Sequence, residues 1–217
     1  RVLCKIIEQE RHLKNPLSEY FLRKELVACI LGSQVKYEMA KIALSRIENA
    51  GLLTDKWWYN SEDQFKAQIL KELSGSDLVA NRKWCYRFPK SRTHQLANAR
   101  DALVEKSLIE RVFSGNEPRE IRKQLISDIA GIGPKQASMF LRNTGISYDL
   151  AILDTHVLHY LNIKKVLSQE QMKIGTLSAY EKTESIVVQY ADSLGYPVGY
   201  LDWAIWATMR AAMELSL

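Results

Sequence analysis

The chain has 217 residues, of which 47% are hydrophobic, and its formal net charge is +5. That length is enough for a substantial core, no apolar run approaches the roughly 20 residues of a membrane span, and the opening RVLCKIIEQE lacks the pattern of a secretion signal. Three scattered cysteines without a CxxC pair exclude a disulfide framework and a four-thiolate metal or iron–sulfur site. We therefore expect a soluble intracellular protein, in the cytoplasm or nucleoid (the nucleus in a eukaryote), whose basic excess permits nucleic-acid binding.

Apolar residues recur at helical spacing along nearly the whole chain, and no sustained alternating run indicates a β-strand. The sequence thus predicts an all-α fold. Capping-box pairs at Ser61 and Gln64 and at Ser168 and Gln171 mark two of the helix starts. The expected helices cover residues 17–32, 35–50, 62–74, 76–86, 91–107, 117–130, 134–143, 154–163, 168–174, 177–194 and 197–213.

The chain offers no clear cut between domains, because it contains no low-complexity tract, no repeat and no long linker. The best breaks in the helical pattern are at residues 57–63 and 87–92. We expect a single helical unit that is divided into two lobes, one of about residues 1–30 plus 150–217 and the other of about 31–149.

The segment DIAGIGPKQASMFLRNTG, residues 128–145, separates two amphipathic helical patterns by only GIGP. So short a connection requires a tight αα-hairpin, in which Gly131 and Gly133 supply unusual backbone angles and Pro134 suits the first helical turn. The backbone N–H groups of both glycines then converge on one point, as they do where a phosphate binds. This pattern indicates a helix-hairpin-helix DNA-binding element, and a plain helix–helix turn is the alternative.

Lys135 stands at the opening of the second helix, where the helix dipole already presents positive charge. The dipole and desolvation both disfavour an ammonium there, so they favour a neutral amine. A neutral amine is a nucleophile that forms Schiff bases, which suits a catalytic role. Contact with solvent or with a phosphate is the simpler alternative.

A carboxylate follows in the segment YDLAILDTHVLHYL, residues 148–161. Asp154 comes after a buried-looking run and before a helical pattern, so it is expected at a helix N-cap, and capping alone is its simplest role. His156 falls at the same helix entrance, where it either meets a phosphate or lies on the surface.

GIGPK followed by LDTH, with 19 residues from Lys135 to Asp154, resembles the signature of the helix-hairpin-helix DNA glycosylase superfamily. Residues 25–40, 84–100 and 201–207 (ELVACILGSQVKYEMA, WCYRFPKSRTHQLANAR and LDWAIWA) are similar to segments of the archaeal-type, or type 2, 8-oxoguanine DNA glycosylase/AP lyases. The resemblance runs from about residue 20 onward. It implies a two-lobed helical glycosylase fold with a DNA-binding cleft between the lobes, acting as a monomer on double-stranded DNA that contains a damaged base.

The resemblance also implies a mechanism. The target nucleotide is flipped out of the duplex, and Lys135 attacks C1′ of its sugar and displaces the base. Asp154 stays ionised, helps to activate the amine and stabilises the positive charge that develops as the glycosidic bond breaks. The resulting Schiff base permits β-elimination of the 3′ phosphate.

Further roles carry over to matching positions. Phe88 and Trp206 sandwich the extruded base, and Asp202, one helical turn before Trp206, belongs to the same base pocket. Gln34 fills the space that the base vacates, and Arg87 faces the orphaned base. Without the resemblance, the aromatic residues are ordinary core residues and Gln34 and Arg87 are solvated polar groups.

Gly131, Gly133 and His156 are the expected phosphate-binding residues. In relatives the hairpin carbonyls hold a monovalent cation, here at the backbone of Ile129 and Ile132, and no side-chain metal site and no cofactor are expected.

One feature departs from the pattern of the type 2 enzymes. These commonly end in a short lysine-bearing tail that helps to recognise the oxidised purine, whereas this sequence has no lysine after Lys182. A glycosylase for another damaged base and a non-catalytic helix-hairpin-helix DNA-binding module therefore stay open as alternatives. The iron–sulfur branches are disfavoured by the scattered cysteines.

Overall fold

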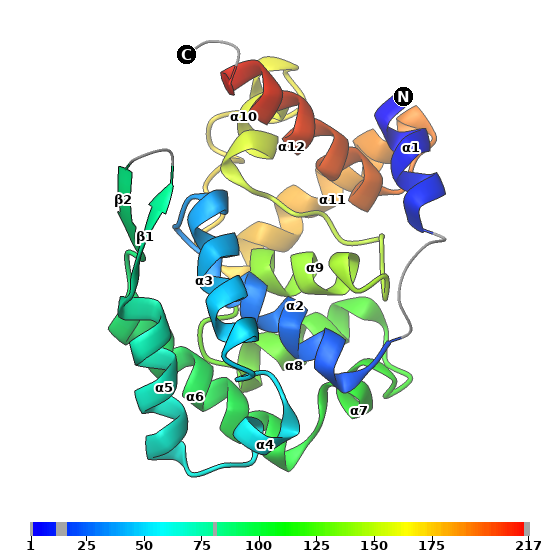
Figure 1. Ribbon diagram of the computed structural model, residues 1–217. Coiled ribbons are helices and arrows are strands. Elements are labelled where there is room, and N and C mark those ends of the chain that lie inside the picture. Colours follow the sequence, from blue (N-terminus) through cyan, green and yellow to red (C-terminus); the bar gives the residue numbers. More distant parts are fainter. Residues whose placement is uncertain (1, 12–16, 80–81, 215–217) are drawn as a thin grey trace. The chain divides into compact units, whose positions relative to one another are not determined.

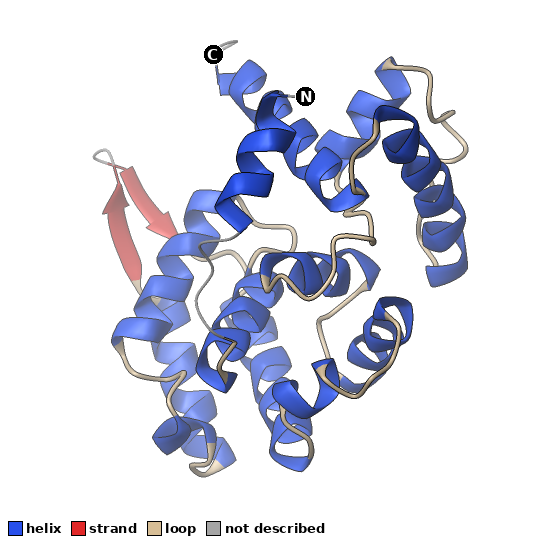
Figure 2. Cartoon of the chain, turned by 90° about the vertical axis from the view of Figure 1, so that its right-hand side faces the viewer, coloured by secondary structure: helices blue, strands red, loops and turns tan. Residues whose placement is uncertain are grey.

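The computed structural model describes residues 2–11, 17–79 and 82–214. Helices make up almost all of the regular structure in these ranges, and the one exception is a short two-stranded hairpin (Figure 2). The expected all-α class is therefore confirmed. The elements in chain order are α1 (Val2–Arg11), α2 (Glu19–Leu31), α3 (Tyr37–Asn49), α4 (Asp55–Trp58), α5 (Glu62–Ser74), β1 (Ser76–Val79), β2 (Arg82–Cys85), α6 (Pro89–Glu105), α7 (Leu108–Val112), α8 (Pro118–Asp128), α9 (Pro134–Asn143), α10 (Thr155–Ile163), α11 (Leu177–Leu194) and α12 (Val198–Glu214).

The chain divides into two compact units. We call Leu17–Gln136 the central unit, and Arg1–Pro16 together with Ala137–Leu217 the terminal unit. Helix α9 begins in the central unit and continues into the terminal unit after its third residue. The lobe limits expected from the sequence, near residues 30 and 150, stay a prediction. No helix within the described ranges is both long and apolar enough to cross a bilayer.

The core of the central unit is built by α2, α3, α5 and α6, with α3 packed on α2 and α5, and α5 along α6. The apolar residues of α2 at helical spacing, Leu22, Leu26 and Ile30, are fully buried, as the sequence pattern predicts. At the start of α5, Phe65 meets Trp58 of α4 edge to face with ring centroids 5.6 Å apart.

The prediction of a helix over residues 76–86 is wrong. Strands β1 and β2 form an antiparallel hairpin there, with Ser76 opposite Cys85 and Val79 opposite Arg82. The hairpin follows α5 directly (Figure 1). Gly75 ends α5 with an extended backbone, and a Cβ at this position would lie 2.0 Å from the guanidinium of Arg46. The absence of a side chain at Gly75 thus makes room for Arg46.

The terminal unit packs α12 against α1, α10 and α11. Its core includes Leu161, Val187 and Ile205, and Cys4 lies in a smaller cluster with Tyr148 and Tyr200. Burial raises the pKa of the Cys4 thiol, as expected for a reduced structural cysteine.

The helix expected over residues 168–174 is absent. Ser168 and Gln171 do exchange the two hydrogen bonds of a capping box, at 2.8 and 3.4 Å, but turns follow in place of a helix. The Gln171 carbonyl accepts a hydrogen bond from the hydroxyl of Thr183 at 2.6 Å, so these turns are tied to α11. The short helices α4 and α7 and the N-terminal α1 were not predicted from the sequence.

Candidate nucleic-acid and catalytic site

The hairpin of the central unit has the tight geometry that its sequence predicts. Helix α8 ends at Asp128, and α9 starts at Pro134. Gly131 has a φ of +86°, and a Cβ there would lie 2.7 Å from Cδ of Gln95. Both its left-handed backbone and its close contact with α6 therefore require glycine.

Gln136 ties the hairpin to the turn that follows α2. Its Oε1 accepts the Gly133 N–H at 3.3 Å, and its Nε2 donates to the Ser33 hydroxyl at 3.0 Å. Buried Arg92 of α6 donates to the Ser33 carbonyl at 2.6 Å and to Oε1 of Gln95 at 2.5 Å. These bonds join three segments that lie far apart in the sequence.

Gln34 follows Ser33 directly and has a φ of 58°, which is unusual for a residue with a side chain. Its side chain is exposed. Strained backbone of this kind is kept where the surrounding contacts fix it and is common at functional sites. The bonds of Arg92 and Gln136 to Ser33 supply such contacts.

Lys135 is the second residue of α9 and is half-buried, so the residue stands at a helix N-terminus as predicted. The Gly133 N–H beside it is occupied by Gln136 at the long distance of 3.3 Å, which a phosphate oxygen would have to displace. Phosphate binding at Gly131 and Gly133 stays a prediction.

Ile129 ends α8 with an extended backbone, at φ −117° and ψ 110°. Its carbonyl accepts the Ile132 N–H at 3.3 Å, which leaves one lone pair for another partner. The Ile129 carbonyl is thus an oxygen ligand of the kind that hard cations prefer, and a monovalent cation at Ile129 and Ile132 stays a prediction. No group of three or more potential metal-binding side chains occurs in the parts of the chain that the structure describes.

Phe88 caps the N-terminus of α6 and is half-buried. The guanidinium of Arg87 lies 4.8 Å from the centroid of its ring, and that of Arg92 lies 5.5 Å from it. Arg87 itself is exposed. The predicted roles of Phe88 against the flipped base and of Arg87 against the orphaned base stay predictions.

Asp154 in the terminal unit is the N-cap of α10, where its Oδ1 accepts the Val157 N–H at 2.8 Å. This is the capping role expected from the sequence. A carboxylate offers about four lone-pair sites, so one cap bond does not saturate it. His156, half-buried, is the second residue of the same helix.

Asp202 on α12 is 1% exposed, and both of its carboxylate oxygens are engaged. Oδ1 accepts a hydrogen bond from Nη1 of Arg142 at 2.5 Å, and Oδ2 accepts one from the Ile152 N–H at 2.7 Å. Burial raises the pKa of Asp202 to about 7, although Arg142 and the Ile152 N–H oppose the shift. Trp206, one turn later, is half-buried, and the guanidinium of Arg210 lies 5.4 Å from its ring centroid.

The structure thus groups the predicted residues within their own units. Gln34, Arg87, Phe88 and Lys135 belong to the central unit, and Asp154, His156, Asp202 and Trp206 belong to the terminal unit.

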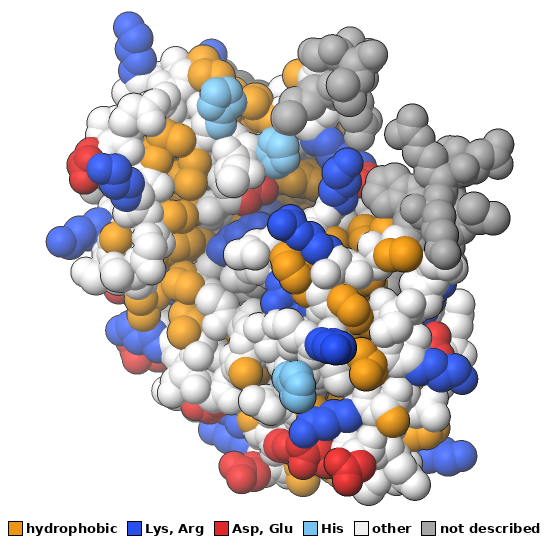
Figure 3. Space-filling model, turned by 90° about the vertical axis from the view of Figure 1, so that its left-hand side faces the viewer, with side chains coloured by type: hydrophobic (Ala, Val, Ile, Leu, Met, Phe, Trp, Pro, Cys, Tyr) orange, Lys and Arg blue, Asp and Glu red, His pale blue; other side chains and the backbone are white. Residues whose placement is uncertain are grey.

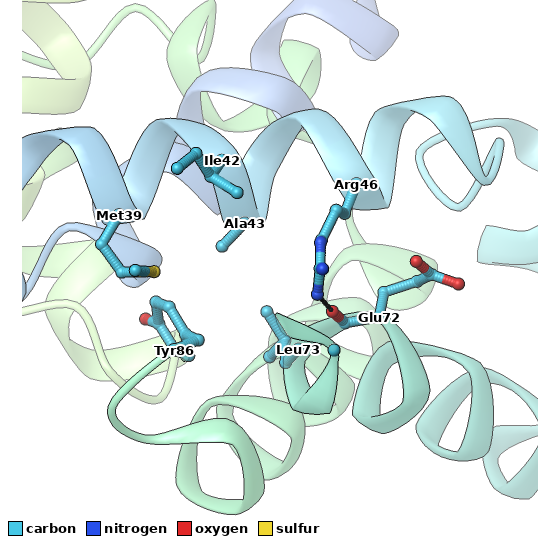
Figure 4. A pocket seen from close by; sticks show the side chains of 8 residues that line it. Met39, Ile42, Ala43, Arg46, Glu72, Leu73 and Tyr86 are labelled. Carbon is cyan, nitrogen blue, oxygen red and sulfur yellow. Dashed lines mark hydrogen bonds between the residues drawn. The ribbon is translucent and has the colours of Figure 1, made fainter. Parts of the chain in front are cut away.

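A small hollow in the central unit is not a nucleobase site. It lies between α3, the end of α5 and Tyr86, and contains about 10 Å³ of free space, which is room for roughly one water molecule (Figure 4). Arg46 donates to the Glu72 carbonyl at 3.0 Å along its wall. The Tyr86 hydroxyl donates to the Leu31 carbonyl, and burial raises the pKa of Tyr86.

Comparison with known proteins decides the family. The family model described as 8-oxoguanine DNA glycosylase matches residues 4–196, a range that contains the hairpin, Lys135 and Asp154. The chain belongs to the 8-oxoguanine DNA glycosylase family. The recognised family and the helix-hairpin-helix glycosylase fold expected from the sequence are thereby confirmed.

Relatives of this family match over most of their length. A Sulfurisphaera tokodaii protein named 8-oxoguanine DNA glycosylase/AP lyase is 33% identical over 198 residues, which are 91% of this chain and 86% of that protein. A protein of the same name from Saccharolobus solfataricus is 28% identical over 95% of this chain and 91% of its own length.

Solved structures of the family have the same fold. The Methanocaldococcus jannaschii 8-oxoguanine glycosylase/lyase, in complex with a 15mer DNA containing 8-oxoguanine, aligns with a TM-score of 0.72 and 25% identity over 94% of this chain and 87% of that one. The Thermotoga maritima 8-oxoguanine DNA glycosylase aligns with a TM-score of 0.66 and 26% identity over 94% of each chain.

Several residues that form hydrogen bonds near the predicted site residues could not be predicted from the sequence. Arg92 and Arg142 read as ordinary surface arginines of helices, yet they bind Ser33 and Asp202. Gln136 has a signal, because a glutamine three residues after the N-cap is the second half of a capping box. Tyr180 and Glu184 have none, since their partners lie in a distant loop.

Proposed function

We propose that this chain is a bifunctional DNA glycosylase and AP lyase that removes 8-oxoguanine from double-stranded DNA at the start of base excision repair. The observation that carries the proposal is the family match over residues 4–196, within which Lys135 opens a helix after a tight glycine turn and Asp154 caps another. The relatives that match this chain over most of their own length are named for this activity.

Lys135 is the proposed nucleophile. The damaged nucleotide leaves the base stack, because its C1′ is inaccessible within the duplex. The amine of Lys135 forms a bond to C1′ while the glycosidic bond breaks and its electron pair leaves with the base. Loss of the amine proton and opening of the sugar give a Schiff base, which acidifies C2′ and expels the 3′ phosphate by β-elimination.

Asp154 is the proposed electrostatic partner. Its carboxylate stabilises the positive charge that develops on the sugar as the base leaves, and it helps to activate the amine of Lys135 by accepting a proton from it as the new bond forms. The N-cap bond to Val157 fixes the direction of the carboxylate, so no side-chain entropy is lost at the moment of reaction.

The remaining predicted residues complete the proposal. Phe88, Trp206 and Asp202 form the base pocket, and Gln34 and Arg87 contact the gap in the duplex and the orphaned base. The phosphate contacts come from Gly131, Gly133 and His156, and the carbonyls of Ile129 and Ile132 hold a monovalent cation, which would add positive charge beside the phosphate. We place the enzyme as a monomer inside the cell, where its DNA substrate is.

Borohydride trapping tests this proposal. A duplex containing 8-oxoguanine, incubated with the protein and borohydride, should give a covalent protein–DNA adduct, because reduction fixes the Schiff base. Lys135→Gln should give no adduct. Lys182→Gln, which removes an exposed lysine of α11, is the matched control and should trap as the wild type does.

The outcomes separate the alternatives. An adduct from Lys135→Gln at the wild-type yield would refute Lys135 as the nucleophile. Parallel duplexes carrying an alkylated purine and an oxidised pyrimidine test the base, and trapping on one of these alone would point to another lesion. A wild-type protein that binds DNA but neither releases a base nor traps a lesion is a binding module.

A further inference from the structure

The candidate catalytic Asp154 is carried by a buried segment that is neither helix nor strand. Residues 150–153 immediately precede Asp154, and each of them is at most 4% exposed. Backbone N–H and carbonyl groups that are buried in this way need hydrogen-bond partners. One bond is local, since the Asp154 N–H donates to the Ile152 carbonyl at 3.0 Å, but the N–H groups of residues 151–153 need acceptors from outside the segment. The partners of this segment therefore decide where Asp154 lies.

Three buried side chains from two helices supply these partners. Oε1 of Glu184 accepts the Ala151 N–H at 3.0 Å, and Oδ2 of Asp202 accepts the Ile152 N–H at 2.7 Å. The Tyr180 hydroxyl accepts the Leu153 N–H at 3.1 Å and donates to the Ala151 carbonyl at 2.7 Å. Three consecutive N–H groups thus each have a side-chain acceptor.

Burial and further contacts restrict the three side chains that supply these partners. Tyr180 and Glu184 are one turn apart on α11 and at most 1% exposed, so they present one face to the segment. Asp202 on α12 is paired with Arg142 in the last turn of α9, and that guanidinium lies 5.3 Å from the ring centroid of Trp203. Buried polar networks whose members are all bonded restrict a segment to one geometry.

We propose that Tyr180, Glu184 and Asp202 are positioning residues that fix the carboxylate of Asp154 through the backbone of Ala151, Ile152 and Leu153. The inference rests on the proposed function, since it gives Asp154 a catalytic task. Within the base pocket it assigns Asp202 the task of holding the protein backbone, because this carboxylate is 1% exposed and both of its oxygens accept hydrogen bonds from the protein.

Tyr180→Phe tests the inference with the smallest change. It removes one hydroxyl and leaves the Leu153 N–H and the Ala151 carbonyl without that partner, so the segment should shift. We expect the single-turnover rate of 8-oxoguanine excision to fall between about tenfold and a hundredfold. Asp154→Asn should lower the same rate at least as much.

Thr183→Val is the matched control on the same helix. Thr183 is 4% exposed, and its hydroxyl donates to the Gln171 carbonyl, outside the segment that carries Asp154. The variant also loses one buried hydroxyl, so it should be destabilised to a similar extent, but its excision rate should stay within about twofold of the wild type.

A second readout separates positioning from general damage. A duplex with a preformed abasic site has no base to release, so its cleavage needs the activation of Lys135 but not the charge stabilisation that we assign to Asp154, whereas excision needs both. In Tyr180→Phe the ratio of the excision rate to the abasic-site cleavage rate should therefore fall. This ratio does not depend on the fraction of enzyme that is folded. Glu184→Met should lower the ratio likewise, and Glu184→Gln, which keeps an acceptor oxygen, should restore it.

An unchanged ratio in Tyr180→Phe and Glu184→Met would overturn the inference, as would an equal fall in Thr183→Val. Failure of the proposed function looks different, because the wild type itself would then release no base and trap no DNA.

Discussion

Gly131 is required both by the backbone of the hairpin turn and by its contact with Gln95. Its φ of +86° costs an L-residue about 1–2 kcal/mol, and Gln95 occupies the space of a Cβ. Gln95 also accepts a hydrogen bond from Arg92, which holds the Ser33 carbonyl. A side chain at position 131 would therefore disturb the turn that precedes Gln34 as well as the hairpin.

We predict that Gly131→Ala lowers the free energy of unfolding by about 1 kcal/mol more than Gly115→Ala does. Gly115 is the control because its φ is +78° and a Cβ there meets nothing within 4 Å, so it reports the backbone cost alone. Urea unfolding measures both variants. The excess should disappear when Gln95→Ala is combined with Gly131→Ala, and an equal loss in the two glycine variants contradicts the steric argument.

Among single residues, the sequence is most informative where chemistry is local. The glycine turn, Lys135 at the start of α9 and Asp154 at the N-cap of α10 follow from patterns within a few residues, and the structure has the helices where these patterns put them. The roles of these residues toward DNA stay predictions.

At the scale of elements, α10 and its approach are held by the buried pair of Asp202 and Arg142. Because burial raises the pKa of Asp202 to about 7, from an ordinary value of 3.8, the folded state binds more protons than the unfolded state between these values. This group therefore stabilises the fold fully only below about pH 4, and its contribution is lost as the pH rises toward 7. The nearby charge of Asp154 acts in the same direction.

We predict that the stability difference between Asp202→Asn and the wild type shifts in favour of the variant as the pH rises from about 5 to about 8, by an amount on the order of 2 kcal/mol. Asparagine does not titrate, so it lacks the cost of a buried carboxylate. Urea midpoints at the two pH values provide the measurement. A difference that is constant with pH would show that Asp202 is ionised throughout this range.

The elements that sequence patterns missed involve tertiary contacts. The β1–β2 hairpin follows Gly75, where a Cβ would overlap the guanidinium of Arg46 from another helix. In the turns after Ser168, the Gln171 carbonyl accepts a hydrogen bond from the hydroxyl of Thr183. Neither contact is visible in a local pattern.

At the scale of the whole molecule, basic side chains exceed acidic ones, with a net charge of +5. On the face shown in Figure 3, lysine and arginine side chains are distributed among acidic and hydrophobic ones. An excess of this size supports contacts with DNA phosphates, which release counterions when they form.

We predict that the affinity for an undamaged duplex falls as the salt concentration rises, with a linear dependence of log K on log salt. Fluorescence anisotropy between about 50 and 200 mM salt measures the slope. A duplex with 8-oxoguanine should bind more tightly with a similar slope, because phosphate contacts do not read the base. Affinity that is independent of salt would argue against a phosphate interface.

The sequence by itself determined the helical class, the tight hairpin, the family resemblance and the two candidate catalytic residues, since helix faces, turns and caps depend on residues close together in the chain. Only the tertiary structure decided how the segment before Asp154 is held. Its partners Tyr180, Glu184 and Asp202 lie 27, 33 and 50 residues away in the chain. A buried N–H group must be satisfied, but packing alone selects the side chain that satisfies it.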